Sequence, residues 1–434
     1  MVKKYSIIFL TIFSFIILTS CSNPNKLLIL NWGEYIDESL IEIFEEEYNC
    51  QVVMDLGESN EIFYSKLRSG TTCYDIVVPS DYMVKKMYEN DMLAEIDFSK
   101  IPNFDEDNLM PKIKDIADTL ETTSSGISNY YVPYLWGTWG IMYNSSNEEL
   151  TNVVTNSSNS WSSLFDRNIL PEGTRVAMYD SYLHAYYASC RYLGLSTKDE
   201  LSGDELLKIY NLIDNMNYDA WGTDDIKKDI VAKNKDLGFM WAGDFLYYYC
   251  ETLANMIIDA YSKNDIDYSN INEMINTLVA GEKYMDKYVS HIDLFIPDDT
   301  ISFCDNFVIS KDAMHYDLAL EFINFMLSRE EVYNDPSFSN TYYVSYNSPY
   351  VDVYEDIVNL SDVTFDQNDK AIYDEEIKHL DVYSTSLYSK IYNSLMGFAF
   401  EKYYPADSLK GNILSSFDRK YINKINQTFN DARS

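Results

Sequence analysis

Four short clusters in the sequence combine aromatic side chains with a carboxylate. They are Trp32–Tyr35, Pro79–Tyr82, Phe239–Asp244 and Ile301–Asp305. Aromatic faces attract an ammonium group or cover methylene groups, and each cation–π contact contributes about 0.5–2 kcal/mol. Carboxylates hold ammonium groups through charge-assisted hydrogen bonds. An alkyl chain with an amine at each end would satisfy both kinds of side chain, whereas a sugar would require more Asn, Gln and Arg.

Structural roles compete with binding roles at several of these positions. Trp32 and Trp241 could fill core positions at the ends of strands instead of lining a site. Asp81 is interpreted as a helix N-cap, and Asp305 could be a solvated turn residue. Because the chain holds 39 tyrosines, most of them must serve in packing or at the surface.

Motifs of common enzyme and metal sites are absent. No GxGxxG or P-loop follows a strand-like segment, no GxSxG or HExxH occurs, and the four histidines are far apart. Five cysteines remain besides Cys21; none forms a CxxC pair, and one disulfide among them is possible. We therefore expect no catalytic residue, no metal and no cofactor.

Alternating strands and helices position the clusters. Strands are predicted at 27–30, 51–56 and 74–79, each followed by a helix that Asp37, Asn60 or Asp81 begins. This alternation is typical of a parallel, helix-covered α/β sheet, in which ligands bind beyond the carboxyl ends of the strands. Residues 148–160, rich in Asn, Ser and Thr, predict a surface loop. An amphipathic helix is expected at 317–327, and the tail after Asp352 has a mostly helical pattern.

The N-terminus resembles a bacterial lipoprotein signal. Lys3 and Lys4 precede an apolar run, and Leu18-Thr19-Ser20-Cys21 resembles a lipobox. Cleavage after residue 20 would leave Cys21 as the lipid attachment site and the folded body on the extracytoplasmic face of a membrane. The formal net charge of −36 would repel nucleic acid and attract cations.

Several motifs, in their order, resemble one protein family. They are Asn31–Tyr35, Glu58–Glu61, Tyr74–Tyr82, Val132–Gly137, Trp241–Asp244 and Tyr343–Asn347. Together they are similar to the spermidine/putrescine-binding proteins of polyamine ABC transporters. The resemblance implies a two-lobed type II periplasmic-binding-protein fold, with a mainly parallel sheet and helices in each lobe and hinge crossings between them. It implies a first lobe at 21–133, a second lobe at 134–302, a return at 303–345 and a helical part at 346–434 that packs on the second lobe.

The same resemblance implies the ligand-binding residues. Asp305 should hold an amine near the hinge. The family carries a further acidic residue near the segment 179–184, and Asp180 is the candidate for it. The other implied positions are Trp32, Glu34, Tyr35, Ser80, Tyr82, Trp241, Asp244, Phe303 and Tyr343. The implied partners are a polyamine, an ABC permease and its ATPase, and we expect a monomer. Glu34 and Asp180 would lengthen the row of acids, which favours spermidine over putrescine, although Gly33 and His184 depart from the family pattern.

Two other functions remain open at this point. The first is a different solute on the same fold, such as ferric iron bound by the pairs Tyr130-Tyr131 and Tyr342-Tyr343. Trp32 and Trp241 argue against it, because a ferric ion prefers oxygen ligands to indoles. The second is a surface hydrolase that uses Glu34 and Asp305 as a carboxylate pair.

Overall fold

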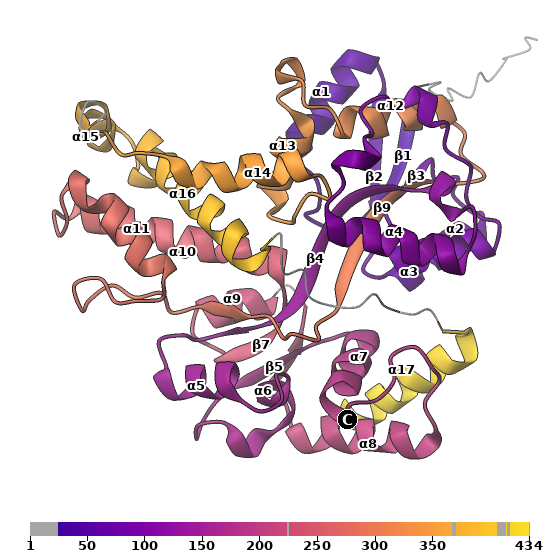
Figure 1. Ribbon diagram of the computed structural model, residues 1–434, viewed down its shortest axis with the longest axis horizontal. Coiled ribbons are helices and arrows are strands. Elements are labelled where there is room, and N and C mark those ends of the chain that lie inside the picture. Colours follow the sequence, from indigo (N-terminus) through magenta and orange to yellow (C-terminus); the bar gives the residue numbers. More distant parts are fainter. Residues whose placement is uncertain (1–24, 224, 367–369, 406–413, 415–416, 434) are drawn as a thin grey trace, which may run out of the picture.

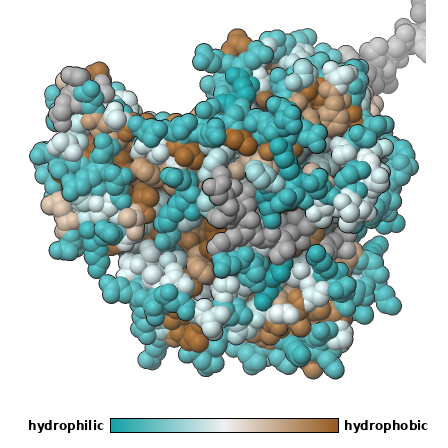
Figure 2. All heavy atoms as spheres, viewed as in Figure 1, coloured by the Kyte–Doolittle hydropathy of each residue, from teal (hydrophilic) through white to brown (hydrophobic). Residues whose placement is uncertain are grey.

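The computed structural model describes residues 25–223, 225–366, 370–405, 414 and 417–433. The predicted signal peptide and Cys21 lie outside these residues. Figure 1 shows two groups of strands and helices, one above the other, joined by the long strand β4. On the face seen in Figure 2, hydrophilic side chains cover much of the described surface, with smaller apolar patches between them. None of the described helices has both the length and the apolar character needed to cross a bilayer.

The described strands form one hydrogen-bonded sheet in the order β2-β1-β3-β9-β4-β7-β5-β6, with β8 beside β4. Neighbours pair in parallel within β2-β1-β3 and within β7-β5-β6, as the alternating sequence pattern predicts. The strands are β1 (Lys26–Asn31), β2 (Gln51–Leu56), β3 (Ile76–Val77), β4 (Val132–Tyr143), β5 (Val176–Tyr179), β6 (Ala220–Gly222), β7 (Leu237–Trp241), β8 (Asp293–Phe295) and β9 (Ser302–Ile309).

Strand β4 belongs to both halves of the sheet. Its first part, from Val132 to Thr138, pairs with β9, and its second part, from Trp139 to Tyr143, pairs with β7. All twelve of its residues are buried. Asn347 forms a third connection, because its N–H and carbonyl both bond to the backbone of Trp136. The two-lobed α/β fold with hinge crossings is therefore confirmed, whereas the exact lobe boundaries stay a prediction.

Helices cover both halves of the sheet. The first half carries α1 (Glu38–Tyr48), α2 (Asn60–Ser69), α3 (Asp81–Glu89), α4 (Pro111–Thr123) and α12 (Tyr316–Met326). The second half carries α5 (Glu148–Asn156), α6 (Ser162–Phe165), α7 (Tyr182–Leu193), α8 (Gly203–Met216), α9 (Asp225–Val231), α10 (Ala242–Ser262) and α11 (Ile271–Val279).

The chain after β9 is helical, as its pattern predicts. Its later helices are α13 (Pro336–Val344), α14 (Val351–Asn359), α15 (Lys370–His379), α16 (Ser386–Tyr403) and α17 (Arg419–Arg433). Helix α16 packs along α10, and α17 packs against α7 and α8. In α17 the buried residues Tyr421, Ile425 and Phe429 recur every four positions, so one face of this helix meets the second half.

The prediction of a loop at 148–160 is wrong, because residues Glu148–Asn156 form α5. The Asn147 side chain accepts a hydrogen bond from the N–H of Leu150 at the start of this helix. Leu150 and Val154 are buried four residues apart, so two apolar contacts and one cap outweigh the low helix propensity of the Asn and Thr residues.

Candidate functional site

Asp305, at the start of β9, is a buried carboxylate between two hydroxyl groups. Tyr35 Oη donates to Asp305 Oδ2 at 2.9 Å, and Ser80 Oγ donates to Asp305 Oδ1 at 2.6 Å. Tyr35 follows β1, Ser80 follows β3, and β9 runs antiparallel to β3. The beginning of β9 therefore lies at the carboxyl ends of β1 and β3, where the sequence predicts a ligand. Burial raises the pKa of Asp305 to about 7, although both hydroxyl hydrogen bonds favour the ionised form.

The Ser80 hydroxyl is held in place by Asn60. The Asn60 amide donates to Ser80 Oγ at 2.9 Å, and its carbonyl oxygen accepts the N–H of Ser80 at 3.0 Å. Asn60 is the first residue of α2, whose N-cap is Ser59. Ser80 is thus oriented toward Asp305 by a side chain that the helix start itself fixes.

Four rings lie in a row across the junction of the two halves, and we call Tyr35, Tyr346, Phe303 and Trp241 the aromatic row. The ring centroids of Tyr35 and Tyr346 are 5.0 Å apart, those of Tyr346 and Phe303 are 6.2 Å apart, and those of Phe303 and Trp241 are 4.8 Å apart. All three pairs meet edge to face, the geometry that aromatic quadrupoles favour. The row therefore offers apolar faces beside the carboxylate of Asp305.

The family resemblance implies Tyr343, not Tyr346, as the further ring of the site. Tyr343 is 57% exposed near the end of α13, whereas Tyr346 is 8% exposed. Tyr346 fits because Gly243 leaves room for it; a Cβ atom on Gly243 would lie 2.4 Å from the Tyr346 ring. The motif Tyr343–Asn347 points to this segment, but only the left-handed turn at Ser345 decides which tyrosine turns inward.

Trp32 and Tyr82 both contact other residues of the first half. The indole N–H of Trp32 donates to the carbonyl of Val78 at 2.8 Å, and its ring packs 4.4 Å from that of Phe63. Tyr82, 7% exposed, donates from its hydroxyl to Glu61 at 3.3 Å. Both positions keep contacts typical of packing residues, and their ligand contacts stay a prediction.

Asp244 and Glu34 both lie beside the ammonium group of Lys227. Asp244 Oδ1 is 3.1 Å from Lys227 Nζ, and Glu34 Oε2 is 4.0 Å away. The Glu34 side chain is 83% exposed, on a backbone with φ of 52°, whereas Lys227 is 4% exposed. Lys227 was not singled out from the sequence, because Lys227-Lys228 in a polar helix suggests a solvated face.

Asp180 forms an ion pair with Arg433, near the end of α17. The nearby His184 is half-buried and packs against the rings of Trp139, Tyr179 and Trp241. Burial lowers the pKa of His184 to about 3, so its imidazole is neutral at physiological pH. The structure therefore places Asp180 against a cation of the chain itself, apart from the contacts around Asp305.

Asp81 is a second buried carboxyl group at the site. It is the first residue of α3 and not its N-cap, which corrects the sequence interpretation; Ser80 holds that position. Asp81 Oδ2 accepts the N–H of Cys304 at 3.0 Å. Burial, and to a smaller extent the nearby charge of Asp305, raises the pKa of Asp81 to about 7. A cap is the commonest role for Asp before a helix, so the sequence carries no signal for this contact.

The described residues provide no evident metal centre. No three His, Cys, Asp or Glu side chains among them gather as a metal ion would require. Tyr130 packs against Tyr88 of α3, while Tyr342 packs against Tyr392 of α16 and donates to Asn393. Cys50, Cys73, Cys190, Cys250 and Cys304 are free thiols, so the possible disulfide is not formed.

Comparison with known proteins agrees with the resemblance seen in the sequence. The putrescine-binding periplasmic protein SpuD of Pseudomonas aeruginosa is 28% identical over 315 residues, which are 70% of this chain and 75% of that protein. The spermidine/putrescine-binding periplasmic protein of Escherichia coli is 30% identical over 222 residues, 50% of this chain and 59% of that protein.

A solved structure and a family model extend the likeness. The structure of a Listeria monocytogenes protein assigned to a spermidine/putrescine ABC transporter has a TM-score of 0.63 and 25% sequence identity. The superposition covers 94% of this chain and 99% of that chain. The family model described as hypothetical lipoprotein (MG045 family) matches residues 1–284. Because this match spans more than half of the sequence, the chain belongs to the MG045 family of lipoproteins.

Proposed function

We propose that this protein is the extracytoplasmic solute-binding component of an ABC transporter and that its ligand is a polyamine. Asp305 binds an ammonium group of the ligand, and the aromatic row covers the methylene groups next to it. The protein binds and releases its ligand and performs no chemistry on it. Spermidine and putrescine, which the relatives are named for, are the first ligands to test.

The environment of Asp305 carries this proposal. A carboxylate that is 4% exposed ordinarily requires a cationic partner, yet Asp305 is contacted by the neutral hydroxyls of Tyr35 and Ser80. An ammonium group would neutralise the buried charge. The apolar faces of Phe303 and Tyr346 would cover an alkyl chain better than a hydrated inorganic cation.

The remaining parts of the proposal follow from the family. Cys21 carries the lipid anchor that tethers the monomeric protein to the membrane, where it delivers its ligand to the permease and ATPase. Opening and closing of the two halves occurs about β4, β9 and the segment at Asn347, which connect them. A Cys21→Ser variant should leave the membrane fraction of the producing cells, and its persistence there would contradict lipid anchoring at this residue.

Titration calorimetry with putrescine and spermidine tests the ligand. Losing the carboxylate partner of a buried ammonium typically costs about 2–5 kcal/mol, so Asp305→Asn should weaken binding at least about tenfold. Asp312→Asn is the matched control, because Asp312 is an exposed carboxylate shortly after β9 and should leave affinity unchanged. Absence of binding to the folded wild-type protein, or equal affinity in Asp305→Asn, would overturn the proposal.

A further inference from the structure

Lys227 places an ammonium group of the chain itself at the site. Its Nζ atom lies 3.1 Å from Asp244 and 4.0 Å from Glu34, two of the carboxylates predicted to bind ligand amines. The same atom lies 6.0 Å from the centroid of the Tyr248 ring. A cation held by carboxylates beside an aromatic ring is the arrangement expected for one end of a polyamine.

The contact also joins the two halves of the molecule. Lys227 and Asp244 belong to α9 and α10 of the second half, and Glu34 belongs to the turn between β1 and α1 of the first half. Asp244 is the closer partner and is only 22% exposed, whereas Glu34 is exposed and its contact is correspondingly weaker. Lys227 therefore contacts Asp244 more closely than Glu34, and it faces the first half.

The charges of the predicted row of acids favour a short ligand. Four carboxylates were predicted to form the row of acids, namely Glu34, Asp180, Asp244 and Asp305. Lys227 faces two of them and Arg433 pairs with a third, while Asp305 receives hydrogen bonds from hydroxyl groups. With all four carboxylates ionised, the charges of Lys227 and Arg433 leave the row with a formal charge of two negative units. A linear diamine would neutralise this charge, and a triamine would exceed it. A third ligand amine at Asp244 would also meet the like charge of Lys227.

We infer that Lys227 determines specificity by taking the place of one amine of a longer polyamine, so that the site selects a linear diamine over a triamine. The inference rests on the proposed polyamine function and reverses the sequence-based preference for spermidine. The preference for spermidine rests on the argument that Glu34 would have no cationic partner with a two-amine ligand. Lys227 provides that partner.

Replacing the lysine tests this inference. We expect wild-type protein to bind putrescine at least about tenfold more tightly than spermidine in titration calorimetry. Lys227→Met removes the charge and keeps a similar length, and it should raise spermidine affinity relative to putrescine by at least about tenfold. Lys227→Gln, which keeps a hydrogen-bond donor for Asp244, should act in the same direction and serves if the Met variant does not fold.

Lys228→Met is the matched control, because Lys228 is the exposed neighbour on the same helix and should leave the affinity ratio unchanged. An unchanged ratio in folded Lys227→Met and Lys227→Gln, with wild-type protein still binding polyamine, would overturn the role of Lys227 and leave the proposed function standing. If neither the folded wild-type protein nor any folded variant binds either polyamine, both the proposed function and this inference are wrong.

Discussion

At the scale of single residues, the site is defined by carboxyl groups that differ in their partners. Asp305 and Asp81 are both buried, and burial raises the pKa of each to about 7. The charge of Asp305 contributes to the raised pKa of Asp81. Asp244 and Asp180 instead lie against Lys227 and Arg433. An incoming cation therefore finds its least neutralised partner at Asp305.

The raised pKa of Asp305 predicts a pH-dependent affinity. A bound ammonium group favours the ionised carboxylate, so binding must release a proton when Asp305 is protonated in the free protein. Affinity for putrescine should rise about tenfold per pH unit from about pH 5.5 to pH 7 and level off above, while the ligand amines stay protonated. Calorimetry across this range measures the slope. In Asp305→Asn, titrated at higher ligand concentration, the slope should become clearly shallower, and the remainder is due to Asp81, whose pKa is also raised to about 7; the same slope there would refute the assignment.

Alanine variants of Trp241 and Trp161 should differ in their effects, because we expect Trp241 to bind ligand and Trp161 to pack in the core. Trp241 is half-buried in the aromatic row, so Trp241→Ala should weaken polyamine binding about 2–30-fold, the equivalent of one cation–π contact. Trp161 is fully buried and its indole N–H donates to Asp299 at 2.9 Å. Trp161→Ala should lower the free energy of unfolding by about 3–5 kcal/mol and leave the affinity of folded protein unchanged. Urea unfolding and calorimetry on both variants decide; a stability loss at Trp241 without an affinity loss would identify a core residue.

The residue types of the site could be predicted from the sequence, but their pairings could not. Aromatic–acid clusters at strand ends led to Tyr35, Ser80, Phe303 and Asp305, which the fold brings together through strand order. Lys227 could not be predicted as a site residue, because its burial depends on the packing of α9 against α10. The sequence near Lys227 gives no sign of that packing. Asp180 is paired by Arg433, more than two hundred residues away in sequence, and such contacts follow from tertiary structure alone.

At the scale of elements, periodic patterns predicted strands β1, β2 and β3, helices α1, α2, α3 and α12 and the helical character of the tail, and failed where a cap decided the outcome. Strands β1 and β2 and helix α12 lie where alternation and amphipathicity place them. Helix α5 was missed because Asn and Ser indicate a loop by composition, whereas the single Asn147 cap starts a helix. The crossing at β4 was expected from the family resemblance, which implied a second lobe from residue 134, but nothing in the sequence of β4 itself marks the change of partner at Trp139.

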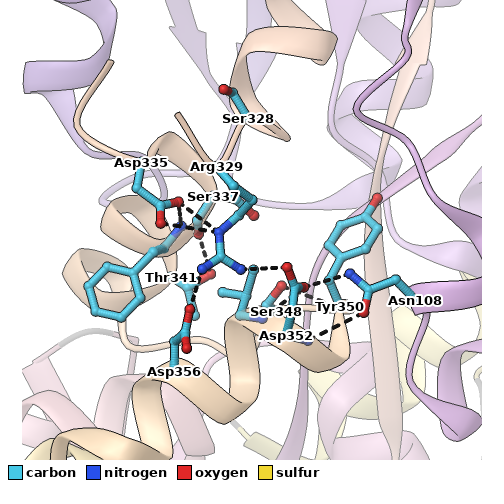
Figure 3. Close-up of polar contacts among 12 residues, drawn as sticks. Asn108, Ser328, Arg329, Asp335, Ser337, Thr341, Ser348, Tyr350, Asp352 and Asp356 are labelled. Atoms are coloured by element: carbon cyan, nitrogen blue, oxygen red, sulfur yellow. Dashed lines mark hydrogen bonds and ion pairs between the residues drawn. The ribbon is translucent and has the colours of Figure 1, made fainter. Parts of the chain in front are cut away.

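One arginine fastens the C-terminal helices to the first half. Figure 3 shows Arg329, between α12 and α13, with its guanidinium directed at Asp335, Asp352 and Asp356. Asp352 also accepts a hydrogen bond from Asn108 of the first half at 2.6 Å. Through these contacts α13 and α14 are fixed against the segment that follows α12 and against Asn108, and three carboxylates share one cation.

Removing this arginine should destabilise the protein without altering ligand recognition. Arg329→Met leaves three neighbouring carboxylates without their cation, and we expect the free energy of unfolding to fall by about 2–3 kcal/mol. Arg68→Met, at an exposed arginine of α2, is the control and should change stability by less than about 0.5 kcal/mol. Urea unfolding at low salt measures both variants. Equal stability of the two would mean that the Arg329 cluster contributes little.

At the scale of the whole molecule, the formal net charge of −36 acts on any cation that approaches. A field of this sign speeds the association of a positively charged ligand and is screened by salt. We therefore expect the association rate of putrescine, followed by tryptophan fluorescence in stopped flow, to fall at least about tenfold between about 20 mM and about 500 mM NaCl. The dissociation rate should change much less, because it depends on short-range contacts inside the site. A parallel series in which sucrose replaces NaCl controls for viscosity. If the association rate is independent of salt and the dissociation rate carries the whole effect, then the surface charge serves solubility alone and the ligand is attracted only at contact.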